Sequence, residues 1–226
     1  MPFGKGVAGY IPNLTLPISR EAEAVVRDFP IGCVVVDLGA GGRRIATHVT
    51  TVDAVSGPGT DVICDVASTP FADASVDCVV ATGLLEHVPD DHAVLREIHR
   101  ILKPGGIVHI EAPFLQQFHA DPIDYRRYTQ SGLAELLRSH AFFVRRSGWH
   151  IGPTVTMLTL ASYYVAMIFE GQYAVNRLLS HAAFLTFRVF AWPFKYIDLF
   201  LVNKPSAHRL AFSVYCVAEK KEAPAS

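Results

Sequence analysis

The sequence predicts an α/β fold built on a doubly wound, mostly parallel sheet of seven strands, with an antiparallel last strand and an apolar helical insert before it. Two observations predict this fold. Short apolar, β-branched runs alternate with segments of helical periodicity over residues 20–148, which favours right-handed βαβ units. A last alternating run at 212–218 follows an unusually apolar stretch. The 226 residues, half of them hydrophobic, suffice for one such domain with a modest insert.

The individual elements follow from periodicity and from residues that begin or end them. A lead-in rich in Gly and Pro covers 1–17, and Ser19 can cap a helix that ends near Phe29. Asp90 or Asp91 can cap a second helix, and a third contains 133–137. The expected strands are 33–36, a strand ending at 51–53, 61–64, 76–81, 107–110, 142–148 and 212–218.

These elements predict three regions. The first, 1–29, is an N-terminal lead-in and helix, and the second combines 30–149 with 209–220 in the sheet domain. The third, 150–208, is an apolar helical insert. We expect the insert to be a lid, a dimer face or a membrane contact.

Composition and charge narrow the class of function. The formal net charge is −1, so no global basic field is present to hold a nucleic acid backbone, and we expect no nucleic acid partner. The four cysteines lie in or beside apolar runs and form no C-x-x-C pair, which is typical of buried thiols in a reducing compartment. The first 16 residues hold no continuous apolar run of a secretory signal. We therefore expect a cytoplasmic protein, with the inner face of the membrane as the alternative location.

A glycine-rich turn after the first strand is the sharpest local signal. The strand ends in Asp37-Leu38-Gly39-Ala40-Gly41, and glycines let a backbone approach a ligand closely. Asp53 ends the next strand, where a carboxylate can accept hydrogen bonds from both ribose hydroxyls. In α/β folds of this kind, ligands bind at this carboxyl edge of the sheet. The dinucleotide fingerprint fails at its third glycine, where Arg44 stands, so a nicotinamide-dependent reductase is only an alternative.

An ordered series of motifs resembles the class I S-adenosylmethionine-dependent methyltransferases, in the type 11, quinone-biosynthesis-like branch. The resemblance covers about 30–150 and the last strand, and implies a Rossmann-like fold. The motifs are Asp37-Leu38-Gly39-Ala40-Gly41, Asp53, Cys64-Asp65-Val66, Pro70-Phe71, Ser75-Val76-Asp77-Cys78-Val79, Leu85-Glu86-His87-Val88 and Leu102-Lys103-Pro104-Gly105-Gly106.

The resemblance implies S-adenosyl-L-methionine as the cofactor, with Asp53 on the ribose and Asp65 on the adenine amine. The residues that it assigns to the cofactor are Asp37, Gly39, Ala40, Gly41, Asp53, Asp65, Val66, Gly83 and Leu84. One feature departs from the family. Only sixteen positions separate Asp37 from Asp53, which leaves room for barely a turn or two of the first crossover helix.

Two histidines are candidates for the proton transfer that an oxygen or nitrogen acceptor needs, because imidazole titrates near neutrality. His87 follows the fourth strand, and His119 lies in the long loop 114–129. The alternative for His87 is a packed side chain that bonds a backbone carbonyl. Loops on rigid scaffolds commonly carry function, and we assign the acceptor to four residues of this loop. They are Gln117, Asp124, Tyr125 and Arg126.

Two further expectations concern the arginines of this loop and metal binding. Arg126 and Arg127 either clamp an anionic group of the acceptor or pair with Asp121 and Asp124 as a structural knot. The histidines and carboxylates show no spacing typical of zinc ligands, so we expect no metal.

The insert contains a segment without formal charge, 151–169, and an aromatic segment, 182–202, interrupted by Arg188, Lys195 and Asp198. Aromatic side chains mixed with Arg and Lys suit a helix lying in the membrane interface. A buried lid or homodimer face is equally compatible, whereas a spanning hairpin is disfavoured by the charges. If the membrane reading holds, the acceptor is a lipid or a lipid-linked sugar, and otherwise a small molecule. A non-catalytic binding protein on the same fold is the remaining alternative.

Overall fold

The structure is a computed structural model that describes residues 21–120 and 122–221. The expected lead-in and the Ser19 cap lie outside these residues. The described chain divides into two compact units. We call them the sheet unit, which holds 21–114, 122–149 and 214–221, and the helical unit, which holds 115–120 and 150–213.

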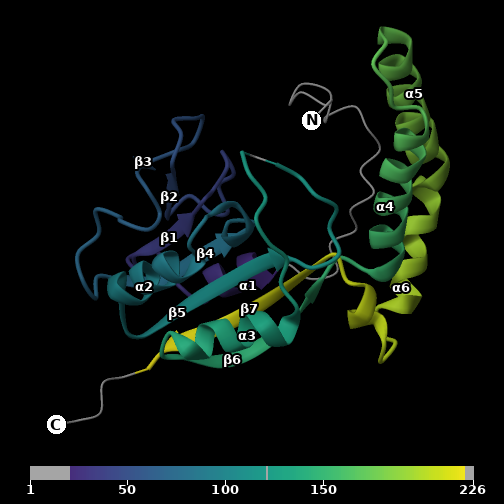
Figure 1. Ribbon diagram of the computed structural model, residues 1–226. Helices are drawn as coiled ribbons and strands as arrows, with labels where there is room; N and C mark the ends of the chain where they lie inside the picture. Colours follow the sequence, from purple (N-terminus) through teal and green to yellow (C-terminus); the bar gives the residue numbers. More distant parts are fainter. Residues whose placement is uncertain (1–20, 121, 222–226) are drawn as a thin grey trace. The chain divides into compact units, whose positions relative to one another are not determined.

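The sheet unit contains a seven-stranded sheet in the order β3-β2-β1-β4-β5-β7-β6 (Figure 1). Strands β1 to β5 are paired in parallel. The last strand runs the other way, because Lys221 N bonds Ala141 O beside the start of β6, and Lys220 Nζ bonds Leu102 O at the start of β5. The strands are β1 (Val35–Leu38), β2 (Val49–Asp53), β3 (Val62–Ile63), β4 (Val76–Thr82), β5 (Leu102–Pro113), β6 (Phe142–His150) and β7 (Ser213–Lys220). The predicted fold class is thereby confirmed.

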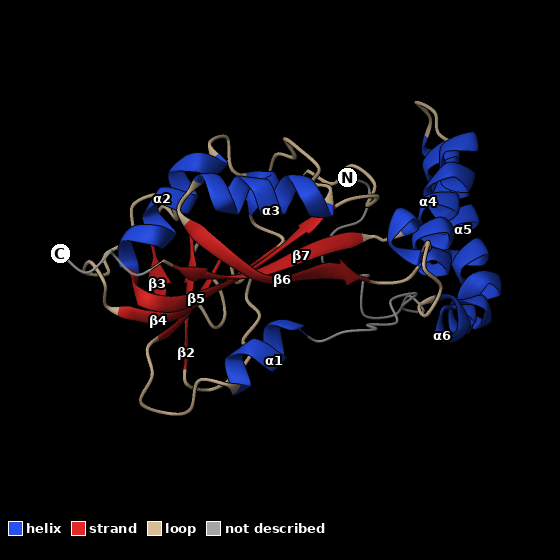
Figure 2. Cartoon of the chain, turned by 90° about the horizontal axis from the view of Figure 1, so that it is seen from below, coloured by secondary structure: helices blue, strands red, loops and turns tan. Residues whose placement is uncertain are grey.

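Helices cover both faces of this sheet, as Figure 2 shows. On one face lie α2 (Asp91–Ile101) and α3 (Gln130–Ser139), and on the other lies α1 (Glu21–Arg27). Asp90 caps α2 by accepting a hydrogen bond from Ala93 N at 2.9 Å, one of the two caps that the sequence allows. Alternate residues of β1 divide between the two cores, with Val36 and Leu38 facing α2 and α3 and Val35 facing α1.

Several element boundaries differ from the sequence expectation. Strand β3 has two residues, Val62 and Ile63, instead of the expected four. Strand β5 begins at Leu102, so Pro104-Gly105-Gly106 lies inside the strand as an irregularity opposite Val76 and does not separate it from α2. The first crossover holds no helix between β1 and β2, only turns. Arg44 ties this crossover together, with its guanidinium 2.8 Å from Val49 O and 2.6 Å from Asp61 Oδ1.

The helical unit is dominated by α4 (Pro153–Ile168) and α5 (Ala174–Ala191), two antiparallel helices drawn side by side in Figure 1. The short elements η3 (Trp192–Ile197), α6 (Asp198–Leu201) and η4 (Ala207–Leu210) follow. The buried carboxylate of Asp198 caps α4, since it accepts from Thr154 N at 2.8 Å and Val155 N at 3.0 Å. Among the described helices, none is both long enough and apolar enough to cross a membrane.

Candidate cofactor-binding and active site

The glycine loop after β1 packs closely at Gly39 against Leu84, which follows β4. Gly39 and Gly41 have φ angles of +70° and +59°, in the left-handed region that favours glycine. A Cβ atom on Gly39 would lie 2.8 Å from Leu84 Cδ1. Gly39 N and Ala40 N donate to Val52 O at 2.9 and 3.1 Å, which fixes the loop at the carboxyl edge of β1 and β2. The predicted glycine turn is therefore an exposed backbone cradle at that edge.

Asp53 lies at the end of β2 and holds the glycine loop. Its carboxylate accepts hydrogen bonds from Gly41 N at 2.8 Å and from Val55 N at 3.2 Å. Each carboxylate oxygen has a second lone pair. The half-buried Asp53 therefore keeps the capacity to accept two hydroxyl groups, as the ribose assignment requires.

Asp37 is fully buried within β1, and one of its carboxylate oxygens lacks a hydrogen-bond donor among the described residues. Its Oδ1 has no hydrogen-bond partner among the described residues, while Oδ2 lies 3.3 Å from the Arg43 guanidinium. Burial raises the pKa of this carboxyl to about 6. A buried acceptor without a donor costs free energy. A ligand that brings an ammonium group to this edge would supply the missing donor, so the site fits a cofactor with an amino-acid end.

The loop after β3 and the loop after β4 carry the remaining cofactor residues. Asp65 is exposed and accepts from Ala67 N at 2.8 Å, and the neighbouring Val66 is buried. Gly83 has a φ of +66°, and Leu84 packs against the glycine loop. The residues that the sequence assigned to the cofactor lie in or shortly after β1, β2, β3 and β4, and their roles toward the cofactor stay predictions.

Sequence reasoning missed Thr82, which ends β4. Its Oγ1 is buried and has no hydrogen-bond partner among the described residues. A threonine at the end of a strand has no local signal that separates it from ordinary β-branched packing. Only the sheet topology places its hydroxyl at the same edge as the glycine loop.

His87 is held by a backbone carbonyl beside a buried carboxyl group. Its Nδ1 lies 2.7 Å from Ile123 O, and a carbonyl only accepts, so Nδ1 carries the proton. In the neutral ring Nε2 is then an acceptor, and it lies 3.8 Å from Glu86 Oε1. Burial raises the pKa of Glu86, which favours its protonated form. The carbonyl contact is the packed arrangement considered for His87, and it also orients the ring.

The segment that contains Asp124, Tyr125 and Arg126 is tied to the sheet unit by ion pairs and backbone bonds. Asp124 pairs with Arg127 at 2.6 Å, whereas Arg126 pairs with Asp91 at 2.5 Å. Tyr125 N donates to the backbone oxygen of Glu86 at 2.8 Å. Arg127 thus pairs with Asp124 as the knot requires and Arg126 pairs with Asp91, while Asp121 lies outside the described residues. The acceptor roles of Asp124, Tyr125 and Arg126 stay predictions.

Gln117 and His119 belong to the helical unit. The His119 ring contacts its own loop, with Nδ1 at 3.2 Å from Gln117 O and Nε2 at 3.3 Å from the Gln116 amide nitrogen. The proposed base and acceptor roles of these two residues are not tested by this geometry.

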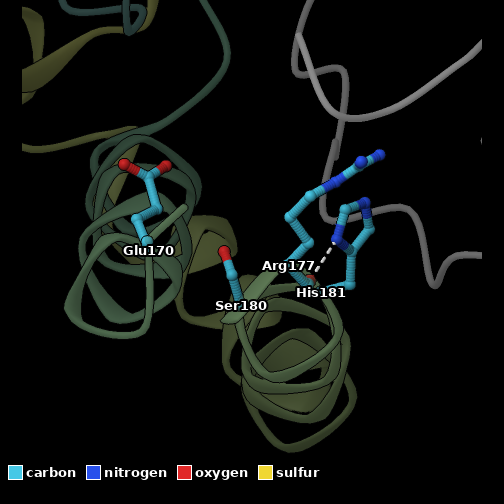
Figure 3. A pocket seen from close by; sticks show the side chains of 5 residues that line it. Glu170, Arg177, Ser180 and His181 are labelled. Atoms are coloured by element: carbon cyan, nitrogen blue, oxygen red, sulfur yellow. Dashed lines mark hydrogen bonds between the residues drawn. The ribbon is translucent and has the colours of Figure 1, made fainter. Parts of the chain in front are cut away.

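A separate pocket of about 360 Å³ lies in the helical unit, where the turn between α4 and α5 ends (Figure 3). Its lining residues are Glu170, Gly171, Arg177, Ser180 and His181. Figure 3 shows the Arg177 and His181 side chains extending together, with His181 Nδ1 at 2.6 Å from Arg177 O. The pocket contains none of the residues that form the glycine-loop edge.

Comparisons with known proteins match part of this chain to methyltransferases. Residues 20–110 match a family described as a methyltransferase domain. A demethylmenaquinone methyltransferase from Staphylococcus epidermidis is 48% identical over 103 residues, which are 46% of this chain and 38% of the relative. The chain spans less than two fifths of the length of the first curated relatives that it matches.

Solved structures share the fold at low identity. The 1,6-didemethyltoxoflavin-N1-methyltransferase of Burkholderia thailandensis, solved with S-adenosylhomocysteine, has a TM-score of 0.55 and 21% identity, over 97% of this chain and 83% of that one. The [4+2]-cyclase SpnF has a TM-score of 0.56 and 17% identity, over 90% and 81%. The fold alone therefore does not determine the reaction.

Proposed function

We propose that this chain, which carries a methyltransferase domain of the class I, S-adenosylmethionine-dependent family, transfers a methyl group to a small-molecule acceptor. The observation that carries the proposal is the edge formed by the glycine loop, Asp53 and the orphaned oxygen of Asp37. One cofactor with a ribose and an amino-acid end would satisfy all three.

Each part of this edge has a proposed contact. Asp53 accepts from the ribose hydroxyls, Asp37 accepts from the methionyl ammonium, and Asp65 with Val66 flanks the adenine. Gly83 and Leu84 line the approach from β4, where Gly83 adopts a positive φ. When bound, S-adenosylmethionine supplies an electrophilic methyl group on a cationic sulfur. The protein then needs only to align the acceptor, exclude water and take up a proton.

We assign the proton to His87. His87 Nε2 would take the proton that the acceptor's O–H or N–H loses when the methyl group leaves the sulfur for the acceptor atom. Nδ1 stays bonded to Ile123 O, which keeps the ring oriented. Glu86, with Oε1 3.8 Å from Nε2, would stabilise the resulting imidazolium when its carboxyl group is ionised. His119 remains the alternative base, and Gln117, Asp124, Tyr125 and Arg126 remain the proposed acceptor contacts.

We further propose that the acceptor is a lipid or is linked to one. Two observations support this choice. The curated relatives include demethylmenaquinone methyltransferases, and the helical unit exposes an extended apolar surface. Methyl transfer measured with membrane extracts and with polar metabolites of similar size would distinguish lipid acceptors from soluble ones.

Calorimetry of cofactor binding tests the central claim. We expect Asp53→Asn to weaken S-adenosylhomocysteine binding by about 1–3 kcal/mol, because hydrogen bonds to a charged carboxylate are lost. Asp73→Asn is the matched control, since Asp73 is 80% exposed and pairs with Arg100 instead of the loop. Tight NADH binding without S-adenosylhomocysteine binding would overturn the assignment in favour of a reductase.

Turnover distinguishes a transferase from a protein that has the fold but another activity, such as the [4+2]-cyclase. Incubation with labelled S-adenosylmethionine and membrane extract should give a labelled product. His87→Asn should lower turnover more than cofactor affinity, and His119→Asn provides the comparison. Equal turnover in the His87→Asn and His119→Asn variants would exclude His87 as the proposed base.

A further inference from the structure

The two long helices of the helical unit bury small and polar side chains. Helix α4 contains no charged residue. Its buried positions are Pro153, Val155, Thr156, Thr159, Ser162 and Ala166. Helix α5 buries Ser180, Phe184 and Ala191. Helix pairs in water bury large apolar side chains between them, whereas helices that pack in lipid are enriched in Gly, Ala, Ser and Thr at their contact.

Many large apolar side chains of both helices are exposed instead, although Phe184 is buried and Leu158 and Phe187 pack against the cluster of Val155 and Ala191. In α5 the exposed positions recur at helical spacing on the side opposite the buried line, and Leu178 and Phe190 are 69% and 73% exposed. Helix α4 exposes Met157, Tyr164, Met167 and Ile168. The exposed side of α5 and of the elements after it consists mainly of Val175, Leu178, Leu179, Val189, Phe190, Trp192, Phe194, Tyr196, Ile197, Leu199 and Phe200. We call this surface the apolar face.

The charged residues of this region are predominantly basic. Residues 151–212 contain two acids, Glu170 and Asp198, and Asp198 is buried as the cap of α4. The five basic residues are Arg177, Arg188, Lys195, Lys204 and Arg209. Arg177, Lys204 and Arg209 are exposed, and Arg177 borders the pocket in Figure 3. An exposed apolar face with a basic surplus complements an anionic lipid surface.

We propose that the apolar face of the helical unit docks on an anionic phospholipid bilayer. The face enters the interface between headgroups and acyl chains, and the basic surplus of the helical unit, with Lys204 and Arg209 exposed, attracts lipid phosphates. Trp192 and Tyr196 have the character of side chains at this depth, and Lys195 Nζ lies 4.9 Å and 5.3 Å from their ring centres. No described helix can span a bilayer, so the contact is with one surface.

A second copy of the chain is the competing occupant of the apolar face. The basic surplus of the helical unit favours lipid over a dimer, because it would repel the same surplus on a second copy and be attracted by a phosphate surface. Docking goes beyond the proposed methyl transfer and needs no activity, so it can be tested whether or not the enzyme assignment holds.

Flotation with lipid vesicles tests the docking. The full chain should float with vesicles of phosphatidylcholine and phosphatidylglycerol in equal parts, and less with phosphatidylcholine alone. Leu178→Glu with Phe190→Glu should lower the vesicle partition by more than about tenfold, because two anchoring side chains become charged. Lys204→Gln and Arg209→Gln should each lower it about fivefold at low salt. Phe143→Glu, at a site in β6 that is 59% exposed, is the matched control and should leave it unchanged.

Other outcomes would overturn the docking proposal. They are failure of the wild-type chain to float, flotation of the double variant at the wild-type level, or a wild-type dimer that the double variant dissociates without any vesicle binding. S-adenosylhomocysteine affinity and circular dichroism report whether the variants are folded and whether the proposed function fails separately.

Tryptophan quenching provides a test that does not depend on the charged variants. The chain has two tryptophans, Trp149 and Trp192, so Trp149→Phe leaves Trp192 as the single reporter. Vesicles with brominated acyl chains should quench Trp192 fluorescence on docking. Emission that stays unchanged at saturating vesicle concentration would place this residue outside the bilayer and overturn the proposal.

Discussion

The sheet unit and the helical unit distribute their apolar side chains in opposite ways. In the sheet unit the fully buried side chains are large, as with Leu85, Ile98 and Phe142. In the helical unit the exposed positions carry the large apolar groups, and buried positions include Thr156 and Ser162. Because apolar burial is the main favourable contribution to folding, the first unit holds its own core and the second leaves much of its apolar area uncovered. The difference suggests that the two units are adapted to different surroundings.

The functional groups are distributed in the same unequal way. The edge of the sheet concentrates an orphaned carboxylate oxygen on Asp37, a positive φ at Gly39 and a buried hydroxyl on Thr82. Such features cost stability and persist where a packed scaffold over-determines them. The helical unit instead exposes many large apolar side chains. Its proposed partner would recognise surface chemistry, whereas the sheet edge would recognise one molecule.

The largest expected effect is on the core beneath the site. Leu133 in α3 is fully buried, and Leu133→Ala should lower the free energy of unfolding by about 2–5 kcal/mol, since it leaves a cavity. Leu136→Ala, on the same helix at a half-buried position, should cost less. Urea denaturation followed by circular dichroism measures both values. Equal losses would mean that α3 packs differently from the structure.

A smaller effect is expected at the glycine loop, and it separates backbone strain from collision. Gly41→Ala meets nothing within 4 Å but keeps a φ of +59°, so it should cost about 1–2 kcal/mol. Gly39→Ala has a similar φ and also brings Cβ to 2.8 Å from Leu84 Cδ1. It should therefore cost about 2–4 kcal/mol of unfolding free energy. If the two variants are equally stable, the loop does not contact Leu84 in solution.

Asp37 should make the stability of the sheet unit depend on pH. Because burial raises its pKa from 3.8 to about 6, the folded state binds this proton more tightly than the unfolded state. The contribution of Asp37 to stability therefore falls as pH rises from about 4 to 6, by at most about 3 kcal/mol. Asp37→Asn removes this dependence and should stabilise the ligand-free protein at pH 7.

The same substitution should weaken cofactor binding, because the orphaned acceptor becomes a neutral amide oxygen. Wild-type affinity for S-adenosylhomocysteine should rise with pH through about 6, as Asp37 ionises to meet the ammonium group. Calorimetry in buffers of different pH measures the trend. A pH-independent affinity in the wild-type chain would exclude Asp37 as the ammonium acceptor.

Contiguous patterns made much of the cofactor edge predictable. A β-branched run followed by Asp37-Leu38-Gly39 indicates both the strand and its glycine turn, and Asp53 ends the next apolar run. The cap at Asp90 was equally local. These signals lie within a few residues of the feature that they predict, so no tertiary information was needed.

Other parts depend on residues far apart in the sequence. The pairing of Arg126 with Asp91 and the burial of Glu86 arise only when the loop folds back on η2 (Leu85–His87) and α2. Arg44 was read only as a missing glycine, yet it closes the short crossover by bonding Asp61. The insert could be recognised from its composition. The exposure of many of its large apolar side chains could be seen only in the structure, because apolar residues occur on every side of α4.

The smallest expected effect completes the contrast between the two units. Leu178 lies on the apolar face of α5, and Leu178→Ala should change the free energy of unfolding by less than about 0.5 kcal/mol in detergent-free buffer. Its side chain is already in water, and alanine is the stronger helix former. A leucine truncation in the core and one on this face should thus differ by several kcal/mol. A loss of about 2 kcal/mol or more at Leu178 would show that another protein surface covers the face in solution, because truncation of an exposed leucine cannot cost that much.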